Sequence, residues 1–163
     1  MSKTREFSFR YEVYENEAEL SEIERILLAK AKAINEKAYA PYSNFWVSAC
    51  LYLTNGEFVE GINQENAAYP SGLCAERVAL FRAGVQFPDV QIEKIMIMAR
   101  FKEAVWQYVS PCGACRQVMM EFEEKQGKNI EVLLYTGTSI IKIFAVKDLL
   151  PFHFEKEILL KNS

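Results

Sequence analysis

Residues 45–62 read Phe-Trp-Val-Ser-Ala-Cys-Leu-Tyr-Leu-Thr-Asn-Gly-Glu-Phe-Val-Glu-Gly-Ile, and this stretch decides the fold class. From 45 to 53 every second residue is apolar in the period of a β-strand. Asn55-Gly56 follows as a two-residue hairpin signal. We therefore expect strands over 45–53 and 57–62 that pair antiparallel.

The sequence on both sides of this hairpin mixes strands with helices. Buried strands are expected over 92–99, 130–135 and 140–146, which makes five core strands. A helix is expected over 17–37, with Ser21 and Glu24 as a capping box inside it or at its start. Two further helices, over 74–83 and 112–125, are each closed by a glycine, Gly84 and Gly127. The fold class is therefore α/β, with a mixed five-stranded sheet covered by helices.

The 163 residues fit a single domain, since no repeat, low-complexity tract or linker divides them. Residues 1–16 form an amino-terminal extension, and alternation over 7–14 predicts a half-buried strand that is an edge or a contact arm. No apolar run approaches the ~18 residues of a membrane span, and no secretory signal is present. We expect a cytoplasmic protein with reduced cysteines. A net charge of −3 disfavours a long nucleic acid as partner.

The chain has one histidine, His153. Catalytic triads, His-pair metalloprotease motifs and His-rich metal sites all need histidine in a motif position, so these mechanisms are excluded. Nothing near His153 resembles a set of metal ligands, and we expect a structural or solvent-facing role for it.

Three of the four cysteines stand at the starts of predicted helices. Ser110-Pro111 precede Cys112-Gly-Ala-Cys115, so Ser110 is expected to cap a helix, Pro111 to occupy its first turn, and the two sulfurs to lie on one face. A lone C-x-x-C pair is shared by redox motifs and structural zinc sites. Cys74, which lies 38 positions before Cys112, adds a third thiol at another helix start.

Three thiolates around Zn²⁺ leave one tetrahedral position for water, whose pKa the ion lowers from 15.7 toward roughly 7. Glu76 lies two residues after Cys74, where it can shuttle protons without being a ligand. Two helix amino termini and hydrogen bonds from Arg77 would offset the negative charge of the sulfurs. Taken singly, Glu76 is a first-turn residue favoured by the helix dipole, and Arg77 is a solvated helix residue.

Cys74-Ala-Glu76-Arg77 and Pro111-Cys112-Gly-Ala-Cys115 together resemble the zinc-deaminase signature, in the variant with cysteine replacing the first histidine. The sequence is similar to the small homotetrameric cytidine deaminases, also through 40–43, 63–69 and 149–151, over about residues 20–155. The resemblance implies a three-layer sandwich, one Zn²⁺ per chain, and hydrolytic deamination of cytidine and deoxycytidine in pyrimidine salvage. It also implies a homotetramer with shared active sites.

The resemblance assigns substrate contacts residue by residue. It implies that Phe45 stacks on the pyrimidine, while Asn63 and Glu65 hydrogen-bond the ribose hydroxyls. Backbone groups near Ala67 and Ala75 would meet the edge of the base. Two polar side chains in one loop that bind sugar hydroxyls would reject the free base, because they would be left unpaired.

Three further aromatic residues are assigned in the same way. Phe154 aligns with a ring that comes from a neighbouring subunit, and Tyr42 and Tyr69 lie at similar subunit-facing positions, with Tyr69 among the substrate-binding residues. For these rings and for Phe45, the alternative is ordinary core packing.

Two departures from the family pattern predict altered packing beside the pocket. Residues 46–50, Trp-Val-Ser-Ala-Cys, replace a stretch that is usually smaller and contains glycine, and Gly61 stands where such proteins commonly carry cysteine. Cys50 fits the strand pattern and is expected to be a buried apolar residue, not a fourth ligand.

Three alternative functions stay open. A blasticidin-type deaminase would share the metal machinery, and a non-catalytic zinc-binding or scaffold domain would have a closed fourth position. A redox protein based on Cys112 and Cys115 would form a reversible disulfide, but it leaves Cys74 and Glu76 unexplained.

Overall fold

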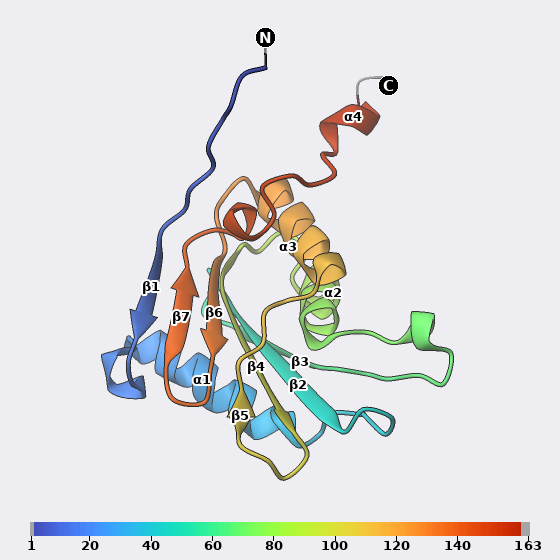
Figure 1. Ribbon diagram of the computed structural model, residues 1–163. Helices are drawn as coiled ribbons and strands as arrows, with labels where there is room; N and C mark the ends of the chain where they lie inside the picture. Colours follow the sequence, from blue (N-terminus) through green and yellow to red (C-terminus); the bar gives the residue numbers. More distant parts are fainter. Residues whose placement is uncertain (1, 161–163) are drawn as a thin grey trace.

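A computed structural model describes residues 2–160 of the chain, and its centre is a seven-stranded mixed sheet (Figure 1). The strand order is β1-β7-β6-β4-β2-β3, and a short β5 pairs with β4. β4 and β6 run parallel, while the other pairs are antiparallel. The strands are β1 (Tyr11–Tyr14), β2 (Phe45–Leu53), β3 (Phe58–Ile62), β4 (Ile92–Phe101), β5 (Trp106–Gln107), β6 (Glu131–Tyr135) and β7 (Ile140–Ile143).

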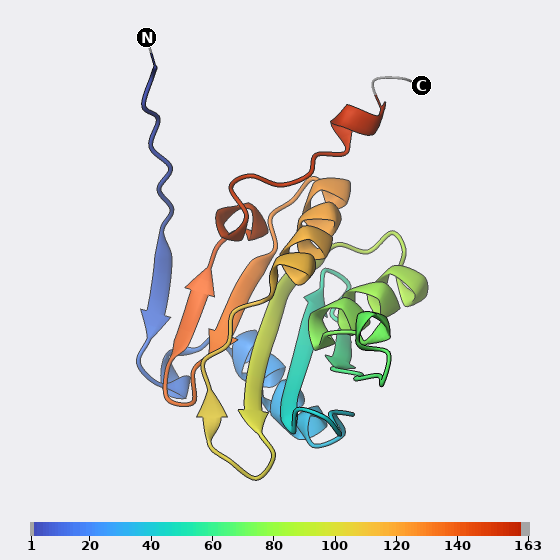
Figure 2. The same cartoon turned by 45° about the vertical axis from the view of Figure 1, so that its right-hand side comes forward.

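Helices cover both faces of the sheet, which gives three layers (Figures 1 and 2). α1 (Glu22–Asn35) packs on one face, and α2 (Ala75–Gln86) and α3 (Gly113–Gln126) pack on the other. Among residues 2–160, no helix is both long enough and apolar enough to cross a membrane. The remaining short elements are 3-10 turns at Glu17–Glu19, Tyr69–Ser71 and Val146–Leu149, and α4 (Glu157–Leu160).

Both faces of the central strands are buried, and alternate residues belong to different layers. In β2, Leu51 packs among residues of α2 and α3, whereas Cys50 packs among residues of α1. β4 repeats this division with Ile97 and Met96. Fully burying a Leu or Ile side chain contributes about 1.5–3 kcal/mol. This burial on both faces holds β2 and β4 firmly beneath α2 and α3.

Several predicted features are confirmed. The five core strands are present as β2, β3, β4, β6 and β7. Gly56 occupies the hairpin turn with a φ of 86°, a conformation that glycine adopts without strain. Ser21 and Glu24 make both hydrogen bonds of a capping box at the start of α1. Gly127 ends α3 in the left-handed conformation, with a φ of 64°.

Two predicted boundaries are wrong. α1 begins at Glu22 and not at residue 17, because Asn16 caps a separate 3-10 turn over Glu17–Glu19. The strand expected over 140–146 ends at Ile143, since a 3-10 turn over Val146–Leu149 takes its place.

Gly84 does not end its helix, contrary to the prediction. α2 continues through this residue to Gln86. A Cβ at Gly84 would lie 3.4 Å from the ring of Phe122 on α3. Packing against α3 therefore keeps the helix regular, although glycine inside a helix costs about 1 kcal/mol relative to alanine.

The amino-terminal extension forms an edge strand, but this strand is not half-buried as predicted. β1 pairs with β7, and residues 2–10 leave the sheet as an extended arm (Figures 1 and 2). The alternating side chains Phe7, Phe9, Tyr11 and Val13 are 53%, 45%, 53% and 44% exposed. Successive rings contact one another, at centroid separations of 6.4 and 6.1 Å. The predicted strand is therefore wrong in two respects: it begins at Tyr11 and not at residue 7, and its alternating side chains are exposed.

α2 lies against β3 at a residue that has no side chain. A Cβ added to Gly61 would stand 2.4 Å from the carbonyl oxygen of Ala75 and 2.5 Å from the backbone nitrogen of Ala79. Both atoms belong to the backbone of α2, so a change of side-chain rotamer cannot relieve the overlap. Gly61 thus sets the distance between β3 and the helix that follows Cys74, and a cysteine here would require α2 to lie farther away.

We expect Gly61→Ala to destabilise the protein by about 1–3 kcal/mol, because the added methyl overpacks against fixed backbone atoms. The midpoint of urea unfolding measures this change. Gly84→Ala is the matched control in α2, since its Cβ meets only a side chain at ordinary contact distance. We expect that control to be neutral or stabilised by up to about 1 kcal/mol. Equal midpoints for the two variants would contradict the inference that Gly61 sets the distance between β3 and α2.

Candidate active site

The structure brings the three predicted metal-binding cysteines together. Cys74 is the N-cap of α2 and Cys112 is the N-cap of α3, while Cys115 lies one turn into α3. The sulfur of Cys112 lies 4.0 Å from that of Cys74 and 3.5 Å from that of Cys115. All three sulfurs lie within 4.8 Å of one another. Residues far apart in sequence thus form a single donor set.

The geometry of this donor set fits zinc. Tetrahedral Zn²⁺ with Zn–S bonds of ~2.3 Å places its sulfur ligands ~3.8 Å apart. The separations of 3.5 and 4.0 Å lie on either side of that value. Three soft sulfur donors favour zinc over the hard cations, which prefer oxygen ligands.

The surroundings of Cys74 favour its thiolate. Hydrogen bonding from Cys115 lowers the pKa of Cys74 to about 5, and Arg77 acts in the same direction. The guanidinium of Arg77 lies 3.9 Å from the Cys74 sulfur and also donates to the carbonyl oxygen of Gly72 at 3.3 Å. In the same cluster the hydrogen bond to Cys74 and burial raise the pKa of Cys115. The amino termini of α2 and α3 add partial positive charge, which favours cysteine side chains in the anionic thiolate form that binds metals.

Glu76 stands beside the sulfurs without joining their cluster. It lies in the first turn of α2 and is 4% exposed. Burial raises the pKa of its carboxyl group. Its Oε2 is buried and has no hydrogen-bond partner among residues 2–160. A buried oxygen without a partner costs roughly 1–3 kcal/mol, which points to a group that meets a ligand.

A pocket of about 650 Å³ opens over the cysteine cluster. This volume lies within the range of small-molecule sites, about 300–1,000 Å³. Its lining includes nine residues that the sequence predicted at the site: Tyr42, Phe45, Asn63, Glu65, Tyr69, Cys74, Glu76, Arg77 and Cys112. The structure therefore brings most of the predicted contacts to one cavity.

Asn63 joins β2 to the floor of this pocket. Its amide nitrogen donates to the carbonyl oxygen of Phe45 at 2.9 Å, and its amide oxygen accepts from the backbone nitrogen of Val47 at 2.9 Å. One N–H and one oxygen lone pair of the amide stay available for a ligand. Asn63 thus fixes the backbone that carries Phe45 and can still bind a hydroxyl group.

Glu65 organises the loop that precedes β2. Its carboxylate accepts hydrogen bonds from the backbone nitrogens of Tyr42 and Ser43, at 2.9 and 3.3 Å, and from the Ser43 hydroxyl at 2.5 Å. Desolvation opposes ionisation, but these hydrogen bonds outweigh it and lower the pKa of Glu65. The role of Ser43 was missed in the sequence, although Ser43 precedes the strand at a turn, where such a hydroxyl commonly binds backbone or nearby polar groups.

Three predicted contacts lie outside the pocket lining. Ala75 is completely buried in α2, and Ala67 is exposed on the loop before α2. Phe154 lies on the carboxy-terminal segment and is 57% exposed, and its backbone is hydrogen-bonded to Gln117 of α3.

Tyr42 and Tyr69 both line the pocket and stand edge to face, with 6.0 Å between their ring centroids.

The predicted cap at the start of α3 is wrong. The N-cap is Cys112, so Ser110 and Pro111 precede the helix. The Ser110 hydroxyl instead accepts from Arg116 at 2.7 Å, and the same guanidinium donates to the carbonyl oxygens of Pro111 and Leu149 at 2.8 and 2.9 Å. The sequence analysis did not assign this role to Arg116. A cation near the positive end of a helix is unfavourable, so its position there indicates that the cation has a partner outside the helix.

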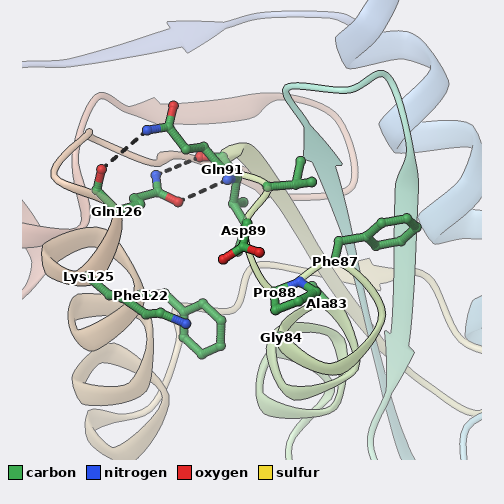
Figure 3. A pocket seen from close by; sticks show the side chains of 11 residues that line it. Ala83, Gly84, Phe87, Pro88, Asp89, Gln91, Phe122, Lys125 and Gln126 are labelled. Atoms are coloured by element: carbon green, nitrogen blue, oxygen red, sulfur yellow. Dashed lines mark hydrogen bonds between the residues drawn. The ribbon is translucent and has the colours of Figure 1, made fainter.

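A second, smaller hollow of about 230 Å³ lies at the carboxyl ends of α2 and α3 (Figure 3). There the side-chain amide of Gln126 accepts a hydrogen bond from the backbone nitrogen of Ile92 and donates one to its carbonyl oxygen, each at 2.9 Å. These bonds fasten α3 to the start of β4. The hollow therefore lies at the opposite ends of both helices from Cys74 and Cys112.

Comparisons with known proteins agree with this geometry. The cytidine deaminase of Sporosarcina psychrophila is 40% identical over 131 residues, which cover 80% of this chain and 90% of that protein. The cytidine deaminase of Mycoplasma genitalium is 32% identical, over 80% of this chain and 94% of that protein. A crystal structure of cytidine deaminase from Burkholderia pseudomallei has a TM-score of 0.66 and 37% identity, over 83% of this chain and 100% of that chain.

The family described as the cytidine and deoxycytidylate deaminase zinc-binding region matches residues 21–128. This range contains all three cysteines of the cluster and Glu76. By its sequence, its fold and its cysteine cluster, the chain belongs to the zinc-binding cytidine and deoxycytidylate deaminase family.

Proposed function

We propose that this protein hydrolyses cytidine and 2′-deoxycytidine to uridine and 2′-deoxyuridine, with release of ammonia. One observation carries the proposal. The buried carboxylate of Glu76, with an oxygen that lacks a partner within the described part of the chain, lies beside three converging sulfurs at a pocket that also holds Asn63 and Glu65. The relatives named cytidine deaminase support the same substrate class.

The chain's own residues divide the work of this reaction. Cys74, Cys112 and Cys115 would hold Zn²⁺, which supplies an acidified water as the nucleophile when it is bound. Oε2 of Glu76 takes a proton from the attacking water and delivers it to the ring nitrogen of the pyrimidine. The same carboxylate then takes the remaining proton of the hydroxyl group added to the ring carbon and donates it to the departing amino group, which leaves as ammonia. Arg77 stabilises the thiolate of Cys74 throughout.

The sugar is the second recognition element. The free N–H and lone pair of Asn63, together with the carboxylate of Glu65, would bind the ribose hydroxyls, and Phe45 would stack on the base. Glu65 is already held by the loop at Tyr42 and Ser43, so its oxygens are fixed before the ligand arrives. Free cytosine would leave the remaining N–H and lone pair of the buried Asn63 amide without a partner, which is a basis for rejection.

We further propose a homotetramer in the reducing cytoplasm, with active sites shared between subunits. The exposed rings of Tyr69, at 76%, and Phe154, at 57%, support an arrangement in which a neighbouring subunit covers them. All four cysteines are free thiols, which suits a reducing compartment.

Ammonia release from cytidine, deoxycytidine, cytosine and blasticidin tests the assignment. We expect turnover of both nucleosides and at least a hundredfold lower efficiency with cytosine. Preference for blasticidin would support that alternative instead. Stoichiometric zinc without turnover of any substrate would indicate a zinc-binding scaffold, and a reversible disulfide between Cys112 and Cys115 in metal-free protein would indicate redox chemistry.

A further inference from the structure

The carboxy-terminal segment from Leu149 onward lies along α3 and is hydrogen-bonded to it at three places. The carbonyl oxygen of Leu149 accepts from Arg116. The backbone nitrogen and carbonyl oxygen of Phe154 bond the side-chain amide of Gln117, each at 3.1 Å. Between these contacts, Nε2 of His153 lies 2.8 Å from Oε1 of Glu124. The path of the segment over α3 is therefore defined by side-chain contacts.

The contact between His153 and Glu124 is largely shielded from water. Their side chains are 15% and 18% exposed. Oε2 of Glu124 is buried and lacks a hydrogen-bond partner within the described chain. A carboxylate in this setting needs a nearby cation, because burying an unpaired charge is costly.

Two acidic groups act on the imidazole: Glu124 on α3 and, at longer range, Glu155 in the same segment as His153. The hydrogen bond to Glu124 raises the pKa of His153 above its usual value, desolvation opposes the shift, and the carbonyl oxygen of Leu150 adds to it. The geometry and the charges thus favour the protonated ring.

We propose that His153 is a positioning residue, whose protonated ring pairs with Glu124, fixes the carboxy-terminal segment on α3 and so places Phe154 for substrate binding. The inference rests on the proposed function and its shared active sites, in which Phe154 of one subunit would reach the nucleoside site of a neighbouring subunit. Gln117 lies two residues after Cys115, so the anchor of Phe154 belongs to the helix that also supplies the metal site.

The direction of the pH dependence follows from the raised pKa. The ion pair is fully formed below the unfolded pKa of histidine, ~6.5, and weakens as the pH rises through the higher folded value. Loss of the proton leaves the charge of Glu124 uncompensated against α3. The segment is therefore expected to loosen at alkaline pH.

Hydrogen exchange of the zinc-loaded full chain tests the positioning directly. We compare the wild type with His153→Lys, which keeps a cation at all these pH values, and with His153→Gln, which keeps only hydrogen bonding. Corrected for intrinsic rates, protection of residues 150–155 should fall about tenfold between pH 6 and pH 8.5 in the wild type. It should stay high in the Lys variant and low in the Gln variant. Equal protection in all three proteins at both pH values overturns the proposal.

The Michaelis constant for cytidine tests the consequence for substrate. We expect the KM of the wild type to rise severalfold over the same pH range relative to the Lys variant, with kcat within twofold. If the carboxy-terminal segment loosens while KM stays constant, the inference that His153 places Phe154 for substrate binding is overturned. A wild type that does not deaminate cytidine contradicts the proposed function instead, and the exchange data still decide whether His153 fixes the segment.

Discussion

Substituting Glu76 by Gln is expected to lower the turnover of cytidine by about 10²–10⁴-fold while the protein keeps one zinc ion per chain. Gln has nearly the same shape, but its amide cannot accept and return a proton, and general acid–base catalysis contributes about this factor. Zinc should remain, because Glu76 is not among the three clustered sulfur donors. Steady-state kinetics and metal analysis on the same preparation measure both quantities.

The metal-free Gln variant should also be at least as stable as the metal-free wild type. The carboxylate of Glu76 is buried, with one oxygen that finds no partner in residues 2–160, so its charge opposes folding. Active sites commonly carry such destabilising groups. Glu121→Gln, at an exposed position of α3, is the matched control and should change neither turnover nor zinc content. Turnover within tenfold of the wild type at full zinc occupancy would falsify the proton shuttle.

Substituting Cys115 by Ala is expected to abolish both zinc retention and activity. Two remaining sulfurs, Cys74 and Cys112, cannot hold the ion tightly at micromolar concentration. For the wild type, free zinc at 1,000 times its dissociation constant should add about 4 kcal/mol to the free energy of unfolding. The variant should gain none of this, which thermal unfolding with and without zinc will measure.

Cys50→Ala is the control for loss of a buried thiol. Cys50 is also completely buried, and burial raises its pKa to about 12, so it stays a neutral thiol in the core. We expect a loss of about 1 kcal/mol in stability from the small cavity, with zinc and activity retained. If Cys50→Ala and Cys115→Ala lose zinc equally, the three-cysteine assignment is wrong.

The parts of the fold that were predictable are those in which neighbouring residues decide the conformation. The Asn55-Gly56 turn, the capping box of Ser21 and Glu24, and the stop at Gly127 each depend on a few adjacent groups. Gly84 carries a similar signal to Gly127, but contact with α3 overrides it. Such contact is decided by residues about 40 positions away, and no local pattern reports it.

The candidate site divides in the same way. The cysteines and Glu76 were predictable because their chemistry requires particular residue types at particular spacings. The bonds of Arg116 to Ser110 and Leu149, and of Glu65 to Ser43, link segments whose proximity only the folded chain reveals. The exposure of Phe7 and Phe9 was missed for the opposite reason, since alternation gives the period of a strand without saying what covers it.

The two N-cap cysteines begin different crossover connections, since α2 follows β3 and α3 precedes β6. An ion shared by Cys74 and Cys112 would act as a covalent-like cross-link that closes a loop of 38 positions. By the chain-entropy treatment used for disulfides, a closure of this size disfavours the unfolded state by about 4 kcal/mol. Loss of the metal would then lower stability as well as activity, because proteases would digest the metal-free protein faster than the zinc-loaded protein.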